Sequence, residues 1–330
     1  MISIGFAAAF LIAKRGSLRY TAGMLSLRPM LRKDFDEVAE LIFLSTNSWY
    51  QEHLGRKIFQ GDPADCRLFC EVYEDLDPEC GLVVENVSTG RIVGSCFFHP
   101  RETHVSLGIM NVHPSYFGKG VAARLLKFII EEAEIRQLPL RLISSALNLD
   151  SYSLYNRFGF TPSEIYQDLI ITVPEKGLPS PGKSLPAVRE ADPSDLVGMG
   201  RVEFEVSGIS RERDYCYFLE NKNELWTTLV VENGEGGIDG FLVSIDEPAS
   251  CMIGPGVSKS AQVAEALLRA QLDTFRGKTV VFLLPAKERE LVDVAYRLGA
   301  RNCEMHFAQV RGDAQPIAGI IMPAFLPESA

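Results

Sequence analysis

Two glycines lie at the start of a helical pattern, with a spacing that suits phosphate binding. Residues 111–126 read NVHPSYFGKGVAARLL and lead into apolar residues at helical intervals. Small residues in such a loop let a phosphate approach the backbone, and the free N–H groups at a helix start attract an anion. The spacing therefore predicts a pyrophosphate-binding loop made of Phe117, Gly118, Lys119, Gly120, Val121 and Ala122.

A second segment, residues 148–160, reads NLDSYSLYNRFGF and follows the first after one predicted helix and one predicted strand. Together the two segments resemble the signatures of the GNAT acetyltransferase superfamily, Arg/Gln-x-x-Gly-x-Gly/Ala and Asn-x-x-Ala/Ser-x-x-Leu-Tyr-x-x-x-Gly-Phe. The resemblance covers residues 25–172. Phe117 stands where the family has Arg or Gln. That change removes one side-chain donor and predicts weaker cofactor affinity, because backbone amides normally supply most pyrophosphate contacts.

The resemblance implies an N-acetyltransferase that moves acetyl from acetyl-CoA to a primary amine by direct attack in a ternary complex. It implies that the backbone near Val112 pairs with pantetheine like an added strand, and that Asn148 and Ser151 contact the cofactor. A backbone N–H near Asn111 or Val112 would stabilise the oxyanion. Tyr155 would protonate the departing thiolate, and its alternative role is that of a core aromatic residue.

The general base is left open by the sequence. Many family members place a carboxylate on the fourth strand, and the matching position here is near Ser106, which cannot act as a base unaided. His104 lies two residues earlier and hence on the same face of that strand. Glu85 on the preceding hairpin is a second candidate. The family's acceptor pocket corresponds to Trp49, Tyr50 and His53, with ordinary packing against the sheet as the alternative.

The elements that must position these residues alternate between strand and helix patterns. Strands are predicted at residues 25–29, 81–86, 92–99, 104–113 and 140–147, and helices at 32–43, 121–134 and 151–158. The order predicts an α/β fold in which a mixed sheet is flanked by helices.

After a segment rich in proline and glycine, the second half repeats this order. Strands are predicted at residues 188–190, 226–231, 240–245 and 279–284, and helices at 195–202, 261–275 and 288–298. We therefore predict two tandem GNAT-like domains: a catalytic domain at residues 24–174, a linker at 175–186 and a degenerate domain at 187–330.

The second half has lost the residues that carry the chemistry. Aligning the two halves puts Gln262 opposite Gly120 and Ala295 opposite Tyr155. The C-terminal half resembles the degenerate second domain of tandem GNAT proteins, and we expect it to cover the acceptor side. Residues 254–256, Gly-Pro-Gly, lie on the strand side of the helix entry, and ligand binding there is left open.

Composition limits the partners of the chain. The formal net charge of −10 over 330 residues argues against nucleic acid and is compatible with a cationic amine acceptor. The seven cysteines have no CxxC spacing and the five histidines do not cluster with them, so no metal is expected. We expect reduced thiols and a cytoplasmic location. Assembly as a homodimer is left open.

The first 23 residues contain an apolar run at 2–13 that is followed, and not preceded, by positive charges. The run is too short to cross a bilayer and lacks the order of a secretory signal. We expect residues 1–23 to be a non-native or disordered extension with no membrane association, and a membrane anchor is the alternative.

The alternative function is a protein that binds or senses acyl-CoA without turnover. Phe117 and the missing carboxylate at Ser106 favour it, whereas Tyr155 and the intact glycine loop favour the enzyme.

Overall fold

The computed structural model describes residues 20–22, 24–234 and 236–328, and these form two compact units. Unit 1 contains the chain up to His99 together with Leu107–Glu132. Unit 2 contains Pro100–Ser106 and the chain from Ala133 onward. The boundary between the units therefore falls inside the first repeat, whose last elements pack with the second repeat.

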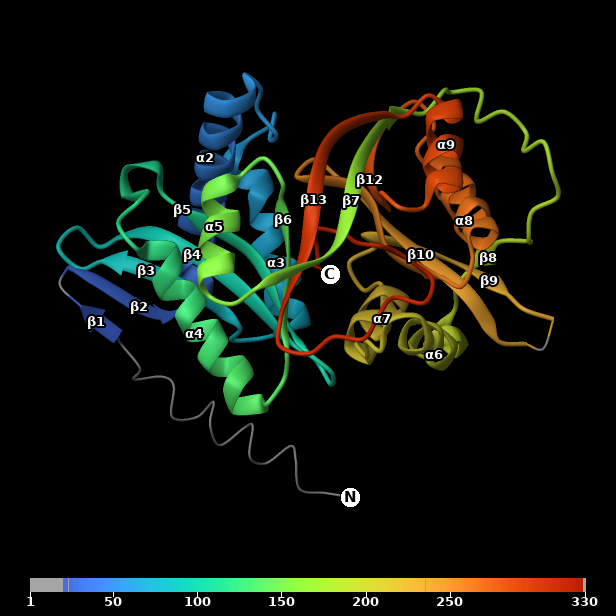
Figure 1. Cartoon of the computed structure of the whole chain (residues 1–330). Helices are drawn as coiled ribbons and strands as arrows, with labels where there is room; N and C mark the ends of the chain where they lie inside the picture. Colours follow the sequence, from blue (N-terminus) through green and yellow to red (C-terminus); the bar gives the residue numbers. More distant parts are fainter. Residues whose placement is uncertain (1–19, 23, 235, 329–330) are drawn as a thin grey trace. The chain divides into compact units, whose positions relative to one another are not determined.

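Unit 1 is built on strands that follow the order of the chain, β1-β2-β3-β4-β5 (Figure 1). The first four pair antiparallel. Their bounds are β1 (Tyr20–Ala22), β2 (Leu25–Pro29), β3 (Gly81–Asn86), β4 (Arg91–Pro100) and β5 (Val105–Val112). The extension expected at residues 1–23 lies outside the described residues, apart from the three of β1.

Three helices belong to this part of the chain: α2 (Phe35–Leu54), α3 (Arg67–Leu76) and α4 (Val121–Arg136). The helix predicted at residues 32–43 is too short, because α2 continues to Gly55, which ends it with a left-handed φ of 66°. Polar residues interrupt the apolar pattern of α2 without ending the helix. Asn47, for example, is buried, and its side chain accepts the N–H groups of Ile58 and Phe59 at 3.0 Å each.

Unit 2 contains strands in the order β6-β13-β7-β12-β11-β10-β9-β8, with β14 paired to β11. The strands are β6 (Leu140–Ser145), β7 (Thr161–Thr172), β8 (Arg189–Glu190), β9 (Trp226–Glu232), β10 (Ile238–Glu247), β11 (Ser250–Ser258), β12 (Thr279–Pro285), β13 (Arg301–Arg311) and β14 (Ile320–Met322). The helices are α5 (Leu149–Arg157), α6 (Leu196–Ser207), α7 (Glu212–Glu220), α8 (Ala261–Asp273) and α9 (Arg289–Leu298).

The two faces of the unit 2 sheet are covered by different helices. On β10, Phe241 packs edge-on against Tyr215 of α7, with ring centroids 5.3 Å apart. The next residue, Leu242, belongs to the apolar core that α8 and α9 fill. Since successive side chains of a strand point to opposite faces, α7 lies on one face and α8 and α9 on the other.

The two repeats exchange strands within unit 2. β7 ends the first repeat but pairs with β12 of the second, from Thr172 opposite Thr279 to Tyr166 opposite Pro285. β13 of the second repeat lies between β6 and β7 of the first. Figure 1 shows β13 in red beside β7 in light green. The sheet of unit 2 therefore needs residues from both repeats.

Each repeat keeps the same ion-paired corner at its first strand. In unit 1, Arg28 of β2 binds Asp34 at 2.6 Å and Glu85 of β3 at 2.8 Å. In unit 2, Arg189 of β8 makes the equivalent contacts. It binds Asp195, which again lies six residues later, and Glu232 of β9. The corner joins the strand to the start of the following helix in both repeats.

Candidate functional site

The glycine loop connects β5 to α4 through one turn of 3-10 helix at Pro114–Tyr116. Gly118 and Gly120 take φ values of 71° and 78°, which glycine adopts without strain. No described atom lies within 4 Å of the position that a Cβ would take at either glycine. Phe117 through Gly120 are exposed. The loop is therefore open to a large anion at its backbone.

Hydrogen-bond donors converge on this opening. The Arg124 N–H bonds the Gly120 carbonyl at 3.1 Å and closes the first turn of α4. The N–H groups that precede it at a helix start have no acceptor in the turn before them. Lys119 places its ammonium 5.0 Å from the Tyr116 ring centroid. The donors and the lysine fit the pyrophosphate of an acyl-CoA, whereas the exposed Phe117 side chain adds no donor.

Tyr116 fixes the loop to the sheet. Its hydroxyl accepts a hydrogen bond of 2.7 Å from the side chain of Asn86 at the end of β3. Val112, expected to pair with pantetheine, is the last residue of β5 and is half-buried. Unit 1 thus carries Val112 and all six residues of the predicted pyrophosphate loop.

The residues of the second signature lie in unit 2, around α5. Asn148 caps this helix, because its side-chain oxygen accepts the Ser151 N–H at 3.0 Å. Tyr155 is 7% exposed and packs edge-on against Phe160 with ring centroids 5.8 Å apart. Asn148 therefore orients the first turn of α5, and the helix carries Tyr155 as a buried side chain.

The candidate bases differ in their surroundings. Glu85 is bound by Arg28 in the corner of unit 1, so its carboxylate has a structural partner. His104 belongs to unit 2, is 3% exposed, and has its Nδ1 3.2 Å from the Thr103 hydroxyl. Ser106 is equally buried. The ring of His104 is therefore enclosed by protein.

The predicted acceptor residues form an aromatic group on α2 in unit 1. Trp49 stacks on His53 with ring centroids 4.5 Å apart and meets Tyr50 edge-on at 5.0 Å. The His53 ring also bonds the Trp49 carbonyl oxygen at 2.9 Å. Trp49 and Tyr50 are half-buried and His53 is exposed, and all three belong to a helix, where the sequence pattern showed only a polar and aromatic stretch.

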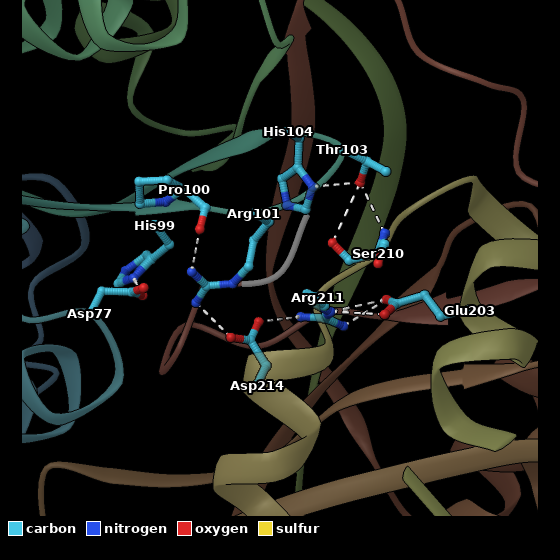
Figure 2. Close-up of polar contacts among 10 residues, drawn as sticks. All are labelled: Asp77, His99, Pro100, Arg101, Thr103, His104, Glu203, Ser210, Arg211 and Asp214. Atoms are coloured by element: carbon cyan, nitrogen blue, oxygen red, sulfur yellow. Dashed lines mark hydrogen bonds and ion pairs between the residues drawn. The ribbon is translucent and has the colours of Figure 1, made fainter. Parts of the chain in front are cut away.

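Four buried charged residues that sequence reasoning missed form a chain of ion pairs in unit 2 (Figure 2). Arg101 binds Asp214 of α7 at 2.5 Å, and Arg211 lies 3.9 Å from the same carboxylate. Arg211 also binds Glu203 of α6 through three hydrogen bonds of 2.7, 2.9 and 3.1 Å. Nearby, the Thr103 hydroxyl accepts the Ser210 N–H at 2.9 Å. The segment Pro100–Ser106 is thereby attached to α6 and α7.

A fifth buried charge lies on β6. Arg141 is 8% exposed, and in the described part of the chain no hydrogen bond or ion pair joins its guanidinium. Burial lowers the pKa of Arg141 below its usual value, although Tyr166 and Glu203 act in the opposite direction. An arginine inside the apolar run LRLI is the sequence signal that could have found it.

In the second repeat the end of β11 is covered by another strand. β11 pairs in parallel with β12 only at Met252 and Ile253. Beyond this point β14 pairs antiparallel with β11, from Gly256 opposite Met322 to Ser258 opposite Ile320. A segment of the chain therefore lies on the end of β11, the strand that corresponds to β5.

The glycines of this region make room for protein, not for a ligand. A Cβ at Gly254 would lie 2.6 Å from the Pro323 carbonyl oxygen, and one at Gly256 only 2.3 Å from a Leu242 methyl group. The start of α8 is capped by the Ser260 hydroxyl, which accepts the Val263 N–H. The glycines at residues 254–256 are thus explained by packing.

A pocket of about 400 Å³ remains beside the start of α8. The lysines that line it are ion-paired: Lys259 with Glu205 at 2.9 Å, and Lys287 with Glu164. Across residues 20–22, 24–234 and 236–328, no cluster of three His, Cys, Asp or Glu side chains is arranged to hold a metal ion. Within the same ranges no helix is both long enough and apolar enough to span a membrane.

Similarity to known proteins agrees with this geometry. The model of the Acetyltransferase (GNAT) family matches residues 40–160, and that of the Acetyltransferase (GNAT) domain matches residues 203–317. No curated protein sequence matches the chain. The two matched segments lie inside the two predicted domains and on either side of the predicted linker.

Solved structures share the fold over nearly the whole chain. A candidate acetyltransferase from Pyrococcus horikoshii has a TM-score of 0.70 at 16% identity, covering 93% of this chain and 97% of its own. A GCN5-related N-acetyltransferase from Sphaerobacter thermophilus gives 0.62 at 18%, covering 91% and 100%. A tandem GNAT protein from the clavulanic acid biosynthesis pathway gives 0.57 at 14%, covering 88% and 100%. The chain therefore belongs to the GNAT superfamily of acyl-CoA-dependent acyltransferases, as a protein with two tandem GNAT domains.

Proposed function

We propose that this chain is a cytoplasmic N-acetyltransferase that moves acetyl from acetyl-CoA to a primary amine by direct attack in a ternary complex. The observation that carries the proposal is the open glycine loop at the start of α4, with two positive-φ glycines and nothing near them. In this proposal residues 117–122 bind the pyrophosphate, while Val112, Asn148 and Ser151 contact the pantetheine arm. The second repeat performs no chemistry.

The proposed reaction needs one acid and one base. The amine nitrogen attacks the thioester carbonyl carbon, a C–N bond forms and the C–S bond breaks. The hydroxyl of Tyr155 gives its proton to the departing thiolate, and the tyrosinate recovers a proton from solvent. A backbone N–H near Val112 stabilises the oxyanion. The proton lost by the amine passes to the base.

Among the candidates for that base we favour His104. Glu85 is bound by Arg28, which holds its carboxylate in the corner of unit 1. A neutral imidazole can take a proton near neutral pH, and His104 lies two residues before Ser106, immediately ahead of β5. Trp49 and Tyr50 are proposed to contact the acceptor.

An acyl-CoA sensor without turnover is the second candidate. It is supported by the exposed Phe117 side chain, which replaces a donor, and by Ser106, which replaces a carboxylate. Such a protein would bind acetyl-CoA and release no free thiol beyond the uncatalysed rate.

Thiol release separates the two functions. The purified chain is mixed with acetyl-CoA and a panel of primary amines, and free CoA is measured over many turnovers. Amine-dependent release above the rate without protein supports the enzyme. Tight acetyl-CoA binding by calorimetry, with no amine raising the rate, overturns the enzyme and supports the sensor.

A further inference from the structure

Arg141 has an exceptional environment for a charged residue. The residue is 8% exposed, and the two acids of the ion-pair chain, Glu203 and Asp214, already bind other arginines. Glu203 accepts three hydrogen bonds from Arg211, and Asp214 binds Arg101. Burying an unpaired charge costs several kcal/mol unless a partner compensates it, so such residues persist where they have a task.

The charges of this region leave one positive charge in excess. Three arginines and two carboxylates form it: Arg101, Arg141, Arg211, Glu203 and Asp214. A single monoanionic group beside Arg141 would balance the set. A carboxylate fits better than a phosphate dianion, because the dianion would bring a second, uncompensated negative charge. The two oxygens of a carboxylate also match the paired N–H groups of a guanidinium.

The sheet register puts Arg141 on a defined face. Arg141 pairs with Ser106 of β5 in parallel register and with Val310 of β13, and directly paired residues share a face. Glu203 of α6 and Arg211 at the start of α7 lie close enough to influence the pKa of Arg141. His104 lies two residues before Ser106, just outside β5.

We propose that Arg141 binds a carboxylate on the acceptor, so that the substrate is a primary amine that also carries a carboxylate. The inference rests on the proposed function, because Ser106 marks the strand position where the family activates its acceptor. The carboxylate forms paired hydrogen bonds with the guanidinium, and the amine points toward the strand that carries Ser106. The amide or ester of the same amine cannot supply the missing charge.

Matched amines test the proposal. Glycine, β-alanine and L-leucine are compared with glycinamide, β-alaninamide and L-leucinamide in the acetyl-CoA assay. We expect kcat/KM to be about 10- to 100-fold higher for the carboxylates, as for a charged hydrogen bond. Arg141→Met should remove this preference, and Arg141→Lys should restore part of it. Arg289→Met, on an exposed side chain of α9, is the control and should keep the preference.

A binding measurement separates this inference from the proposed function. Thermal unfolding is followed with N-acetyl-L-leucine, N-acetyl-L-leucinamide or inorganic phosphate. The carboxylate alone should raise the Tm of the wild type, and Arg141→Met should abolish that rise. The variant itself should have an equal or higher Tm, because it loses an unpaired buried charge.

The outcomes are distinguishable. If amines are acetylated with no preference for carboxylates, the proposed function stands and the assignment of Arg141 is wrong. If no amine is acetylated but the carboxylate still raises the Tm through Arg141, the proposed function fails and the anion site stands. A larger shift with phosphate than with N-acetyl-L-leucine overturns the choice of a carboxylate.

Discussion

The two repeats treat the same strand position in opposite ways. In the first, the loop after β5 presents two glycines to open space, and the residue just before α4 is Gly120, which has no side chain to cap the helix. In the second, β14 lies on β11, Ser260 caps α8, and the glycines pack against protein. Both repeats keep their arginine corner, so scaffold and site have changed independently. The difference teaches that loss of a ligand groove can be a gain of internal packing.

A charge in the open loop should have the largest effect. Gly120→Glu places a carboxylate beside the pyrophosphate and should weaken acetyl-CoA binding by about 100-fold or more, measured by calorimetry. Gly120→Ala carries the same backbone strain without the charge and should weaken it less. Gln262→Glu, the equivalent change in the second repeat, should leave affinity unchanged. If Gly120→Glu and Gln262→Glu weaken acetyl-CoA binding equally, the two repeats do not differ in cofactor binding as proposed.

Removal of the proposed acid should act on turnover. Tyr155→Phe should lower kcat by roughly 100-fold with little change in acetyl-CoA affinity, because the hydroxyl is needed only as the thiolate leaves. Tyr296→Phe in the second repeat, whose hydroxyl bonds Gln167 at 2.7 Å, is the control and should keep full kcat. Unchanged turnover in Tyr155→Phe would identify Tyr155 as a packing residue.

Weakening β14 should affect stability and not ligand number. Ile321 is 4% exposed, so Ile321→Ala should lower the free energy of unfolding by about 2–5 kcal/mol in denaturant titrations. Val197→Ala, at an exposed position of α6, should change it by less than about 0.5 kcal/mol. The stoichiometry of acetyl-CoA should stay at one per chain in both variants. Two molecules per chain would show that β14 alone had closed the second groove.

The arginine corners should give the smallest effect, as a dependence on acid pH. The hydrogen bond from Arg189 lowers the pKa of Asp195. Burial raises the pKa of Asp34, but the hydrogen bond from Arg28 opposes this effect, and the pKa of Asp34 is lowered overall. A lowered pKa stabilises the fold above the unfolded value of about 3.9, and this stability is lost as pH falls through the folded value.

The test compares Asp34→Asn and Asp195→Asn by thermal unfolding between pH 3 and pH 7, a range chosen around the unfolded value. Each variant should lose less stability than the wild type as pH falls. Asp34→Asn should show the larger change, because the Arg28 side chain is 13% exposed and that of Arg189 is 39% exposed, where water screens the pair. If both variants and the wild type have identical pH profiles, the arginine corners do not contribute to the loss of stability at acid pH.

The sequence predicted the strand and helix order well where apolar periodicity was strong, as in β2, β3, β4, α4 and α8. It did not predict α3, α7, β7, β11, β13 or β14. β13 and β7 have unremarkable patterns, and their places are set by pairing with strands of the other repeat, which no local signal reveals. Tertiary hydrogen bonds likewise allow the polar residue Asn47 to be buried within α2, so the helix continues beyond it.

The candidate site divides in the same way. A loop that needs glycine at fixed positions can be recognised from the local sequence, so Gly118 and Gly120 were predicted from their spacing. Ion pairs cannot be recognised in this way, because the partners of Arg101 and Arg211 come from different elements. Whether Arg141 has a partner depends in turn on what its neighbours bind. The arginine in an apolar strand could have been flagged, but not its role.

The exchanged strands have a consequence for synthesis of the chain. On the ribosome β7 is complete at Thr172, while its neighbours β12 and β13, which begin at Thr279 and Arg301, do not yet exist. Until Arg311 has left the exit tunnel, the edges of β6 and β7 offer unpaired backbone groups to any other chain. A pause in translation within the second repeat would therefore prolong a state prone to aggregation, and chaperone binding to nascent chains should be strongest over that interval.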